Sequence, residues 1–305
     1  MEFYTKPGEP ASFSGVNKVT KHAKLSQKKV QKYLGDNPTY VRFKPTRKRF
    51  PRRKYRVFAR HDLLQGDLAD VSKLKRFNGG VTFLLVVVDC FSRYVNVEPV
   101  KNKSAKTILE AFKLILEKIP QVPKNLMTDR GTEFTNELFT SHCSELGINF
   151  YTSQDAATKC SIVERVIKTL KGKLYRYMAA NKTKRYIDAL GELVSSYNNT
   201  YHRSIRMAPS EVNDETEGAL RARVFANFIF APKPAFRYNV GDKVYAAKSR
   251  SAFTKGYTPT FNDEVLHVHQ HKNTSPPVYK LIDSDNNIIS GSFYEQELAH
   301  VPRDQ

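Results

Sequence analysis

Two acidic residues in distinct local settings are the first candidates for chemistry in this chain of 305 residues. Asp129 follows the apolar run 125–128, which predicts a short buried strand that ends at a carboxylate. Glu164 lies three residues after Ser161, and this S-x-x-E pattern predicts a helix start with Ser161 at its cap. Thirty-four residues separate the two acids. A strand end and a helix start can place two carboxylates side by side.

A third acid lies upstream, in the segment 63–71, which predicts another strand. Asp67 precedes Asp129 by 129 − 67 = 62 positions. Asp70 follows three residues later, so strand alternation places its side chain on the opposite side from Asp67. Asp89 ends a strand before a turn, a position that favours Asp for structural reasons. Three carboxylates offer only oxygen ligands, which suit Mg²⁺ or Mn²⁺ and argue against zinc.

The helix that carries Glu164 also carries lysines on the same face. At 3.6 residues per turn, Lys168 and Lys171 lie one and two turns after Glu164. Such a face fits a metal ion beside a phosphate backbone. The alternative is an ordinary surface helix with a solvated Glu–Lys pair, which would contribute only about 0.2–0.5 kcal/mol.

These motifs together resemble the DDE integrases of retroviruses and long-terminal-repeat retrotransposons. The matching residues are Gln65 and Asp67 of a Gln-x-Asp motif, Thr128, Asp129, Gly131 and Phe134 of a Thr-Asp-x-Gly-x-x-Phe motif, and Glu164. The resemblance is greatest to the retroviral-like integrases of Maverick/Polinton DNA transposons and extends from about residue 13 to residue 301. Leu64 stands where the family often has Trp, and the chain contains no Trp.

The resemblance implies a function and a ligand set. Asp67, Asp129 and Glu164 would be the catalytic residues and would hold two Mg²⁺ or Mn²⁺ ions, while Lys168 and Lys171 would bind DNA. The implied activity is metal-dependent 3′-end processing of DNA followed by strand transfer, carried out by a homo-oligomer on double-stranded transposon ends and target DNA. Two other classes stay open: a domesticated, catalytically idle binder of DNA or chromatin, and an RNase H-like nuclease that acts by hydrolysis only.

The net positive charge predicts a polyanionic partner, and the distribution of basic residues predicts that the partner binds near the N-terminus. The net charge is +20, and residues 1–60 hold 17 Lys or Arg residues against three acids. The segment 42–60 contains ten basic residues and no acid, with aromatic side chains interleaved. We expect this arm to follow DNA phosphates or to act as an import signal, in a nuclear protein. Its expected DNA-binding residues are Arg47, Lys48, Arg49, Arg52, Arg53 and Lys54.

Other classes of protein are disfavoured by the same composition. The longest apolar run, 81–88, is far too short to span a bilayer, and the first residues do not resemble a secretory leader, so we expect no membrane partner. Cys90, Cys143 and Cys160 have spacings that suit no metal site, and buried hydrophobic roles in a reducing compartment are expected.

The order of predicted elements defines the fold class. Three strands precede a helix that Ser104 caps, and strand, helix, strand and the Glu164 helix follow. By resemblance, this is an α/β fold: an RNase H-like mixed five-stranded sheet flanked by helices. His202 belongs to a Tyr-Asn-x-Thr-x-His element that closes the core in many retrotransposon integrases, and a structural or DNA-facing role is expected for it.

Smaller parts flank the core. We expect a basic helical module and arm over 1–55, the catalytic core over 56–215, a linker over 216–235, and a small barrel over 236–305 that resembles SH3 or chromodomain folds. The barrel would hold DNA or bind a histone tail in chromatin. The N-terminal module has one His and no Cys, so the zinc-binding domain usual in retroviral integrases is absent. On a regular strand, His267, His269 and His271 would face one side.

Overall fold

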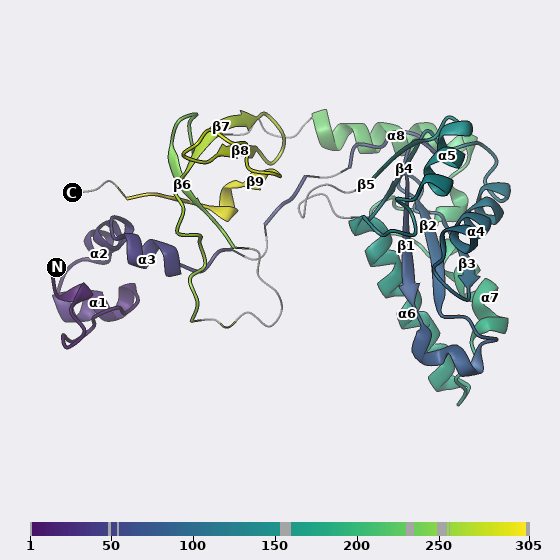
Figure 1. Cartoon of the computed structure of the whole chain (residues 1–305), viewed down its shortest axis with the longest axis horizontal. Coiled ribbons are helices and arrows are strands. Elements are labelled where there is room, and N and C mark those ends of the chain that lie inside the picture. The colour runs from purple at the N-terminus through teal and green to yellow at the C-terminus, as the bar shows by residue number, and fades with distance from the viewer. Residues whose placement is uncertain are drawn as a thin grey trace. The chain divides into compact units, whose positions relative to one another are not determined.

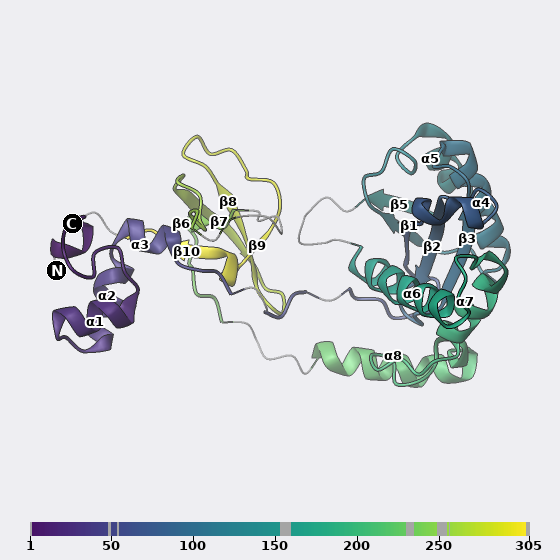
Figure 2. The same ribbon diagram turned by 90° about the horizontal axis from the view of Figure 1, so that it is seen from below.

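A computed structural model describes residues 2–47, 50–53, 55–152, 160–229, 235–248, 255 and 257–302. The chain forms two compact units: residues 54–231 make the core unit, and residues 1–53 with 232–305 make the terminal unit (Figures 1 and 2). Each unit is described by itself. In the described part of the chain, no helix has the length and apolar character needed to cross a bilayer.

The core unit is built on a mixed five-stranded sheet with the order β3-β2-β1-β4-β5. Its strands are β1 (Leu64–Asp70), β2 (Phe83–Asp89), β3 (Val95–Val100), β4 (Asn125–Thr128) and β5 (Asn149–Thr152). The first three strands pair antiparallel, whereas β4 lies parallel to β1 and β5 parallel to β4. The expected mixed five-stranded sheet is therefore confirmed.

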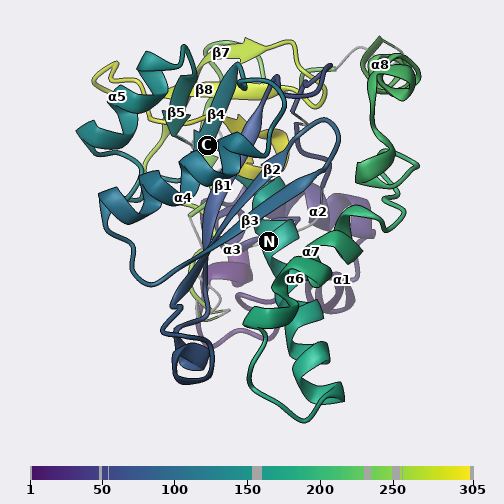
Figure 3. The ribbon, with the colours of Figure 1, turned by 90° about the vertical axis from the view of Figure 1, so that its right-hand side faces the viewer.

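Helices cover both faces of this sheet (Figure 3). One face packs against α4 (Ala105–Glu117) and α5 (Glu137–Glu145), and the other against α6 (Ser161–Ala180) and α7 (Leu190–Asn198). Strand β2, which lies next to the central strand β1, alternates between two buried layers: Leu85 and Val87 face α4, while Val86 and Val88 face α6. Burial on both sides explains the continuous apolar run of this strand.

Local sequence signals account for several boundaries in the core unit. The Ser104 side chain accepts a hydrogen bond from the Thr107 amide and caps α4, as its position predicts. The Asn136 side chain does the same for α5 through the Phe139 amide at 3.0 Å. Helix α8 (Asp214–Ile229) occupies most of the segment expected as a linker, and Glu217 in its first turn pairs with the Arg60 guanidinium at 2.9 Å.

Short 3-10 segments complete the chain, and they lie between the longer elements: η1 (Glu2–Thr5), η2 (Ser72–Phe77), η3 (Ile187–Ala189), η4 (Pro209–Glu211) and η5 (Glu295–Glu297). The terminal unit begins with three short helices, α1 (Val16–Ala23), α2 (Gln27–Gly35) and α3 (Pro38–Phe43). Val19, Val30 and Leu34 are fully buried and pack with Tyr4. The helical module expected near the N-terminus is therefore present.

The C-terminal part of the terminal unit is a five-stranded antiparallel sheet with the order β10-β6-β7-β8-β9. Its strands are β6 (Lys243–Ala246), β7 (Leu266–Lys272), β8 (Val278–Ile282), β9 (Phe293–Tyr294) and β10 (Leu298–His300). Helix α3 joins the two ends of the chain, because Val41 packs with Tyr245 and Phe261 in one buried cluster. The backbone carbonyl of Arg42 also accepts hydrogen bonds from the amides of Thr260 and Phe261 at 2.8 and 3.1 Å.

The three histidines of β7 do not share one side of the strand, so that expectation is wrong. A register shift between Val268 and Gln270 places a bulge at the position of His269. His267 pairs with Ile282, whereas His271 pairs with the fully buried Tyr279 and stacks on Phe236 at 4.0 Å between ring centroids. The bulge reverses the alternation, so these histidines form no stripe.

Candidate active site

Asp67 lies in the middle of the central strand of the core unit. It pairs with Val86 of β2, and its side chain is partly buried on the sheet face that packs against α6. One carboxylate oxygen accepts a hydrogen bond from the Leu68 amide at 2.7 Å. The remaining lone pairs make no hydrogen bond within the described residues, which leaves this carboxylate able to bind a cation.

The structure brings the other two predicted acids to Asp67. Burial raises the pKa of Asp67 to about 6, and the nearby charges of Asp129, Glu164 and Glu133 raise it further, against the opposing hydrogen bond from the Leu68 amide. The pKa of the Cys160 thiol rises to about 12, first through burial and then through the charges of Asp67, Asp129 and Glu164. The charges of the same three carboxylates therefore act on both Asp67 and the buried Cys160 thiol.

Asp129 and Glu164 reach this site from the two predicted positions. Asp129 is the first residue after β4, whose last residue Thr128 is fully buried, and its carboxylate accepts a hydrogen bond from the Gly131 amide at 3.2 Å. Glu164 is exposed in the first turn of α6. A carboxylate is favoured there because the helix dipole is positive at its N-terminus.

The start of α6 is held by Gln65, which the sequence patterns did not indicate as a cap. The helix begins at Ser161, the N-cap residue is Cys160, and no side chain at that position caps the helix, so the predicted Ser161 cap is wrong. Instead, the fully buried Gln65 accepts hydrogen bonds through Oε1 from the amides of Ile162 and Val163 at 3.1 and 3.3 Å. Gln65 and Asp67 are two residues apart on β1, so one strand positions two acids: its own Asp67 and, through the helix, Glu164.

Glu133 is a fourth carboxylate near the site, and it was not among the predicted site residues. Its carboxylate folds back over Gly131, where an added Cβ would lie 2.7 Å from the Glu133 carboxyl carbon. Its charge contributes to the raised pKa of Asp67. The four-residue spacing from Asp129 is the only signal in the sequence that could have placed it here.

Lys168 and Lys171, the two lysines predicted to bind DNA, lie on α6, the helix that bears Glu164. Lys168 is exposed and Lys171 is partly exposed, and neither forms an ion pair within the described residues. The pKa of Asp70 is lowered, first by hydrogen bonds from Ser72 and then by the charges of Lys171 and Lys73. Lys171 therefore lies near the exposed end of β1, where Asp70 points away from the acid cluster.

The chemistry of the donor set fits a hard divalent cation. Within the described residues, no three His, Cys, Asp or Glu side chains converge closely enough to hold a metal ion. However, the acids supply only oxygen ligands, and their mutual repulsion already raises the pKa of Asp67. A bound cation would neutralise that repulsion, and Mg²⁺ or Mn²⁺ is the ion that such ligands prefer.

The predicted DNA-binding arm is described only in part, since Lys48, Arg49 and Lys54 lie outside the described residues. Arg47 is exposed. Arg52 lies over the rings of Phe50 and Tyr294, at 4.6 and 5.3 Å from their centroids, and pairs with Glu297 at 3.3 Å. The Arg53 amide donates to the Tyr294 hydroxyl. Residues 50–53 are thus attached to the C-terminal sheet of their own unit.

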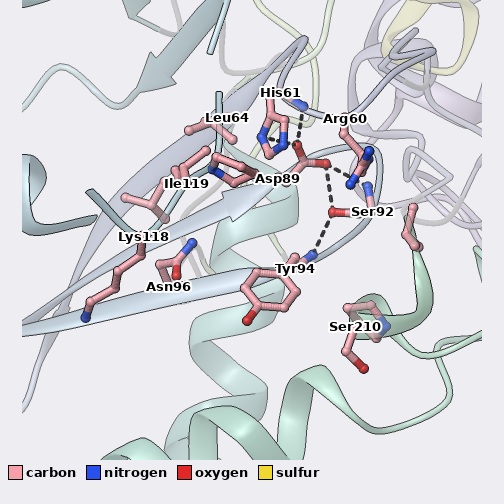
Figure 4. A pocket seen from close by; sticks show the side chains of 14 residues that line it. Arg60, His61, Leu64, Asp89, Ser92, Tyr94, Asn96, Lys118, Ile119 and Ser210 are labelled. Atoms are coloured by element: carbon pink, nitrogen blue, oxygen red, sulfur yellow. Dashed lines mark hydrogen bonds and ion pairs between the residues drawn. The ribbon is translucent and has the colours of Figure 1, made fainter. Parts of the chain in front are cut away.

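A hollow of about 220 Å³ lies on the other face of the core sheet (Figure 4). Leu64, Val87 and Ile119 are among the residues that line it, and His61, Asp89 and Ser92 lie along one side. Asp89 is buried, and one oxygen accepts hydrogen bonds from the amides of Phe91 and Ser92 and from the Ser92 hydroxyl. Asp89 therefore stabilises the β2–β3 turn, as its position before a turn suggests.

His202 also lies apart from the acid cluster. Its Nδ1 lies 2.9 Å from the Ser204 hydroxyl, and its backbone forms a bridge with Met207. Burial lowers the pKa of His202, and the charges of Arg93 and Arg165 lower it further. A neutral imidazole in a closed turn is consistent with a structural role.

Comparisons with known proteins identify relatives of this chain. Residues 59–157 match the model of the integrase core domain. A putative transposon-derived protein of Caenorhabditis elegans, itself uncharacterized, is 32% identical over 232 residues, which are 75% of each chain. A retrovirus-related Pol polyprotein from transposon 412 of Drosophila melanogaster is 25% identical over 233 residues, but the match spans only 18% of its length.

A solved structure extends the likeness to nearly the whole chain. A chain in the cryo-electron microscopy structure of a simian T-cell lymphotropic virus intasome, in complex with a PP2A regulatory subunit, aligns with a TM-score of 0.64. The alignment covers 94% of this chain and 95% of that chain at 18% identity. At this identity the likeness concerns the fold alone.

Proposed function

The chain belongs to the retroviral-like integrase family, and from this premise we propose that it is a metal-dependent polynucleotidyl transferase that processes and joins transposon DNA ends. The observation that carries the proposal is that Asp129 and Glu164 lie near enough to Asp67 for their charges to act on its partly buried carboxyl group. We assign it to the Maverick/Polinton type on the motifs named above, and a nuclear location follows from its DNA substrate.

The proposed roles of the acids follow from their positions. Asp67, Asp129 and Glu164 would together hold two Mg²⁺ or Mn²⁺ ions, which when bound supply activation of an attacking oxygen and stabilisation of a leaving oxygen. Gln65 keeps the first turn of α6 against β1 and so fixes the separation between Glu164 and Asp67. A displacement of about 1 Å at such a site can reduce the rate roughly 10²-fold.

The two steps are the same displacement at phosphorus with different nucleophiles. In end processing, water forms a new bond to phosphorus while the bond to the 3′ oxygen breaks, which leaves a free 3′-hydroxyl on the transposon end. In strand transfer, that 3′ oxygen attacks a phosphorus atom of the target, and the target's own 3′ oxygen leaves. The second step exchanges one phosphodiester bond for another, so it needs no nucleotide energy source.

The lysines of α6 would hold the DNA beside the acids. Lys168 and Lys171 extend along the helix from Glu164, and neither charge is neutralised by an ion pair within the described residues. Contacts of this kind position a duplex through its phosphates and carry no sequence information. Joining two ends requires at least two active sites, so a homo-oligomer is part of the proposal.

A strand-transfer assay tests the proposal directly. The full chain is incubated with Mg²⁺ or Mn²⁺ and a labelled duplex that carries the terminal repeat flanking its gene. Products longer than the substrate are expected from the native protein and should be lost in Glu164→Gln and Asp129→Asn. The matched control is Asp70→Asn, which removes an exposed carboxylate from the same strand as Asp67 and should retain the products.

The other possible outcomes of this assay distinguish the alternative functions. Shortened products without joined ones would favour a hydrolytic nuclease. DNA binding with no metal-dependent product would favour a domesticated binding protein. Strand transfer that persists in Asp129→Asn would exclude these acids as the catalytic set.

A further inference from the structure

Arg93, in the turn between β2 and β3 of the core unit, has a buried guanidinium group. Its Nε and Nη1 atoms are buried, and neither makes a hydrogen bond within the described residues. A guanidinium that is buried without an acceptor loses its hydration and gains no compensating interaction. Arg93 is therefore a candidate for binding an anion that comes from outside the chain.

Two of the groups nearest to Arg93 are neutral and cannot act as its counter-ion. Burial lowers the pKa of the guanidinium, and proximity to Cys90, Tyr197 and Asp89 opposes this shift. Burial also raises the pKa of the Cys90 thiol and of the Tyr197 phenol, so both groups keep their protons at neutral pH. Asp89 is the only carboxylate among the three neighbours.

The Asp89 carboxylate is already engaged by other donors. One oxygen accepts hydrogen bonds from the amides of Phe91 and Ser92 and from the Ser92 hydroxyl, and the other accepts one from the His61 amide at 2.6 Å (Figure 4). In the part of the chain that the structure describes, no hydrogen bond or ion pair joins Asp89 to Arg93. Asp89 therefore stabilises its own turn and leaves the Arg93 guanidinium without a paired anion.

Two further side chains with hydrogen-bond donors lie near Arg93. The pKa of the partly buried His202 is lowered first by burial and then by the charges of Arg93 and Arg165, so these three side chains are neighbours. The buried Asn198 fixes this arrangement, because its side-chain amide bonds both the amide and the carbonyl of Val95 at 2.9 Å. The turn that carries His202 is thereby held against the start of β3, two residues after Arg93.

The three side chains together suit a phosphate group. Arg165 is exposed and forms no ion pair among the described residues. When the Ser204 hydroxyl donates to Nδ1 of the neutral His202 ring, the ring proton lies on Nε2 and is a further donor. The turn 199–207 contains two more arginines and no acid. Arginine binds phosphate oxygens through paired N–H donors in a planar fork, so two guanidinium groups and an imidazole N–H fit this ligand.

We propose that Arg93, Arg165 and His202 form a binding site for a phosphate group that does not itself react. Arg165 directly follows Glu164 on α6, so the site lies on the adjoining face of that helix, beside the acid cluster. The ligand is a backbone phosphate of a bound DNA strand or a free phosphate ion, which have the same chemistry. The assignment to DNA rests on the proposed function. The site itself needs neither the catalytic acids nor a metal ion.

The first test measures the melting temperature of the full chain in EDTA, with inorganic phosphate or with chloride at equal ionic strength. At a phosphate concentration tenfold above Kd, the native chain should melt roughly 3–6 °C higher than in chloride. Arg93→Met should lose this rise. In chloride it should melt no lower than the native chain, because an apolar side chain of similar size replaces an unpaired buried charge.

Two further variants make this test specific. Arg176→Met makes the same substitution at an exposed position of α6 and should keep the phosphate-dependent rise. Arg165→Gln changes only an exposed side chain, so it tests the site without altering a buried group, and it should reduce the rise. If Arg93→Met does not fold, the comparison of Arg165→Gln with Arg176→Met decides the result.

A second measurement separates the two sources of phosphate. Fluorescence anisotropy with a labelled duplex in EDTA gives the slope of log K against log salt. If the ligand is a DNA phosphate, the slope in Arg93→Met should become shallower by about 0.9, the value for one contact, while Arg176→Met keeps the native slope. An unchanged slope together with a lost phosphate-dependent rise assigns the site to a free phosphate ion.

The proposal is overturned if Arg93→Met and Arg165→Gln keep the phosphate-dependent rise, or if Arg176→Met loses it to the same extent. A lower melting temperature of Arg93→Met in chloride, with the rise retained, would show that the guanidinium has a structural role instead. Absence of strand transfer in a native chain that shows the rise would contradict the proposed function alone. Strand transfer by a native chain that shows no rise would contradict this inference alone.

Discussion

The first turns of helices α6 and α2 carry opposite charges, and different interactions cap the two helices. Glu164 lies in the first turn of α6, where the dipole favours an anion, and buried Gln65 binds two amides of that turn. Lys28 and Lys29 lie in the first turn of α2, where the dipole disfavours cations, and a local serine caps the helix. The dipole therefore favours the charge at the start of α6, whereas it disfavours the charges at the start of α2, which a bound anion would offset.

The comparison teaches how to separate structural from binding roles in this chain. At α6, the hydrogen bonds that fix the start of the helix come from buried Gln65. The unneutralised negative charge lies instead on the carboxylates near Asp67. At α2, the apolar side of the helix is fully buried and the surplus charge lies on the solvent side. A bound cation would neutralise the carboxylates near Asp67, and a bound polyanion would neutralise the lysines of α2.

The largest expected effect comes from removing the support of α6. Gln65→Leu keeps the volume but leaves the amides of Ile162 and Val163 without their acceptor, which should lower the free energy of unfolding by about 2 kcal/mol. Strand transfer should fall roughly 10²-fold as Glu164 loses its position. Chemical denaturation and the strand-transfer assay measure the two effects. Ser161→Ala is the control, and since Ser161 does not cap α6, its change should stay within about 0.5 kcal/mol. A greater loss in Ser161→Ala than in Gln65→Leu would contradict this account of the cap.

A smaller effect is expected from the repulsion among the acids. The pKa of Asp67 is raised from 3.8 to about 6 in the folded chain, so ionisation of this group destabilises the fold as pH rises through about 6. Without metal at pH 7.5, Asp67→Asn should therefore melt about 2–4 °C higher than the native protein. This shift is smaller than the full change in pKa would give, because Asp67 is partly exposed to solvent. The difference should vanish below pH 3.8, where the carboxyl is neutral in both states. Added Mg²⁺ should reduce the difference in melting temperature at pH 7.5. A difference in melting temperature that does not change with pH would exclude repulsion among the carboxylates as its cause.

The smallest effect concerns the first turn of α2. Lys28→Glu places an anion at the positive end of the helix dipole and removes the like-charge pair with Lys32, so the local stability of α2 should rise by about 0.5 kcal/mol. Amide hydrogen exchange within α2 measures this change. The same variant should bind duplex DNA more weakly than the native chain. Faster exchange in α2 would show that Lys28 is held by an interaction of the folded module.

The positions of the acids could be predicted from sequence because each depends on local pattern. Asp129 follows an apolar run and Glu164 begins an amphipathic helix, so the elements that carry them were predicted, and the structure brings both to Asp67. The mixed sheet follows from the order of strands and helices. The catalytic roles of the three acids stay predictions that the strand-transfer assay tests.

The incorrect predictions about the Ser161 cap and the β7 histidines arise from contacts between separate elements of the fold. Ser161 had the local pattern of a cap, but Gln65, almost a hundred residues away, supplies the acceptor. The alternation of histidines in β7 was read as a regular strand, but pairing with β8 introduces a bulge at His269. Only its four-residue spacing from Asp129 distinguished Glu133 from a surface acid. For Ser161 and the histidines, contacts outside the local pattern decide the conformation.

The closure of the terminal unit by α3 has a consequence for synthesis of the chain. The Arg42 carbonyl binds amides at 260 and 261, so the contact spans 260 − 42 = 218 residues, and the core unit is translated between its two halves. At roughly 5–20 residues per second, the N-terminal helices emerge about 10–40 s before the strands that complete their unit. During that interval Val41 has no partner, and the α1–α2 pair depends on its small core around Val19 and Val30. The core unit can fold first, between two ends that join only when the last strands have been translated.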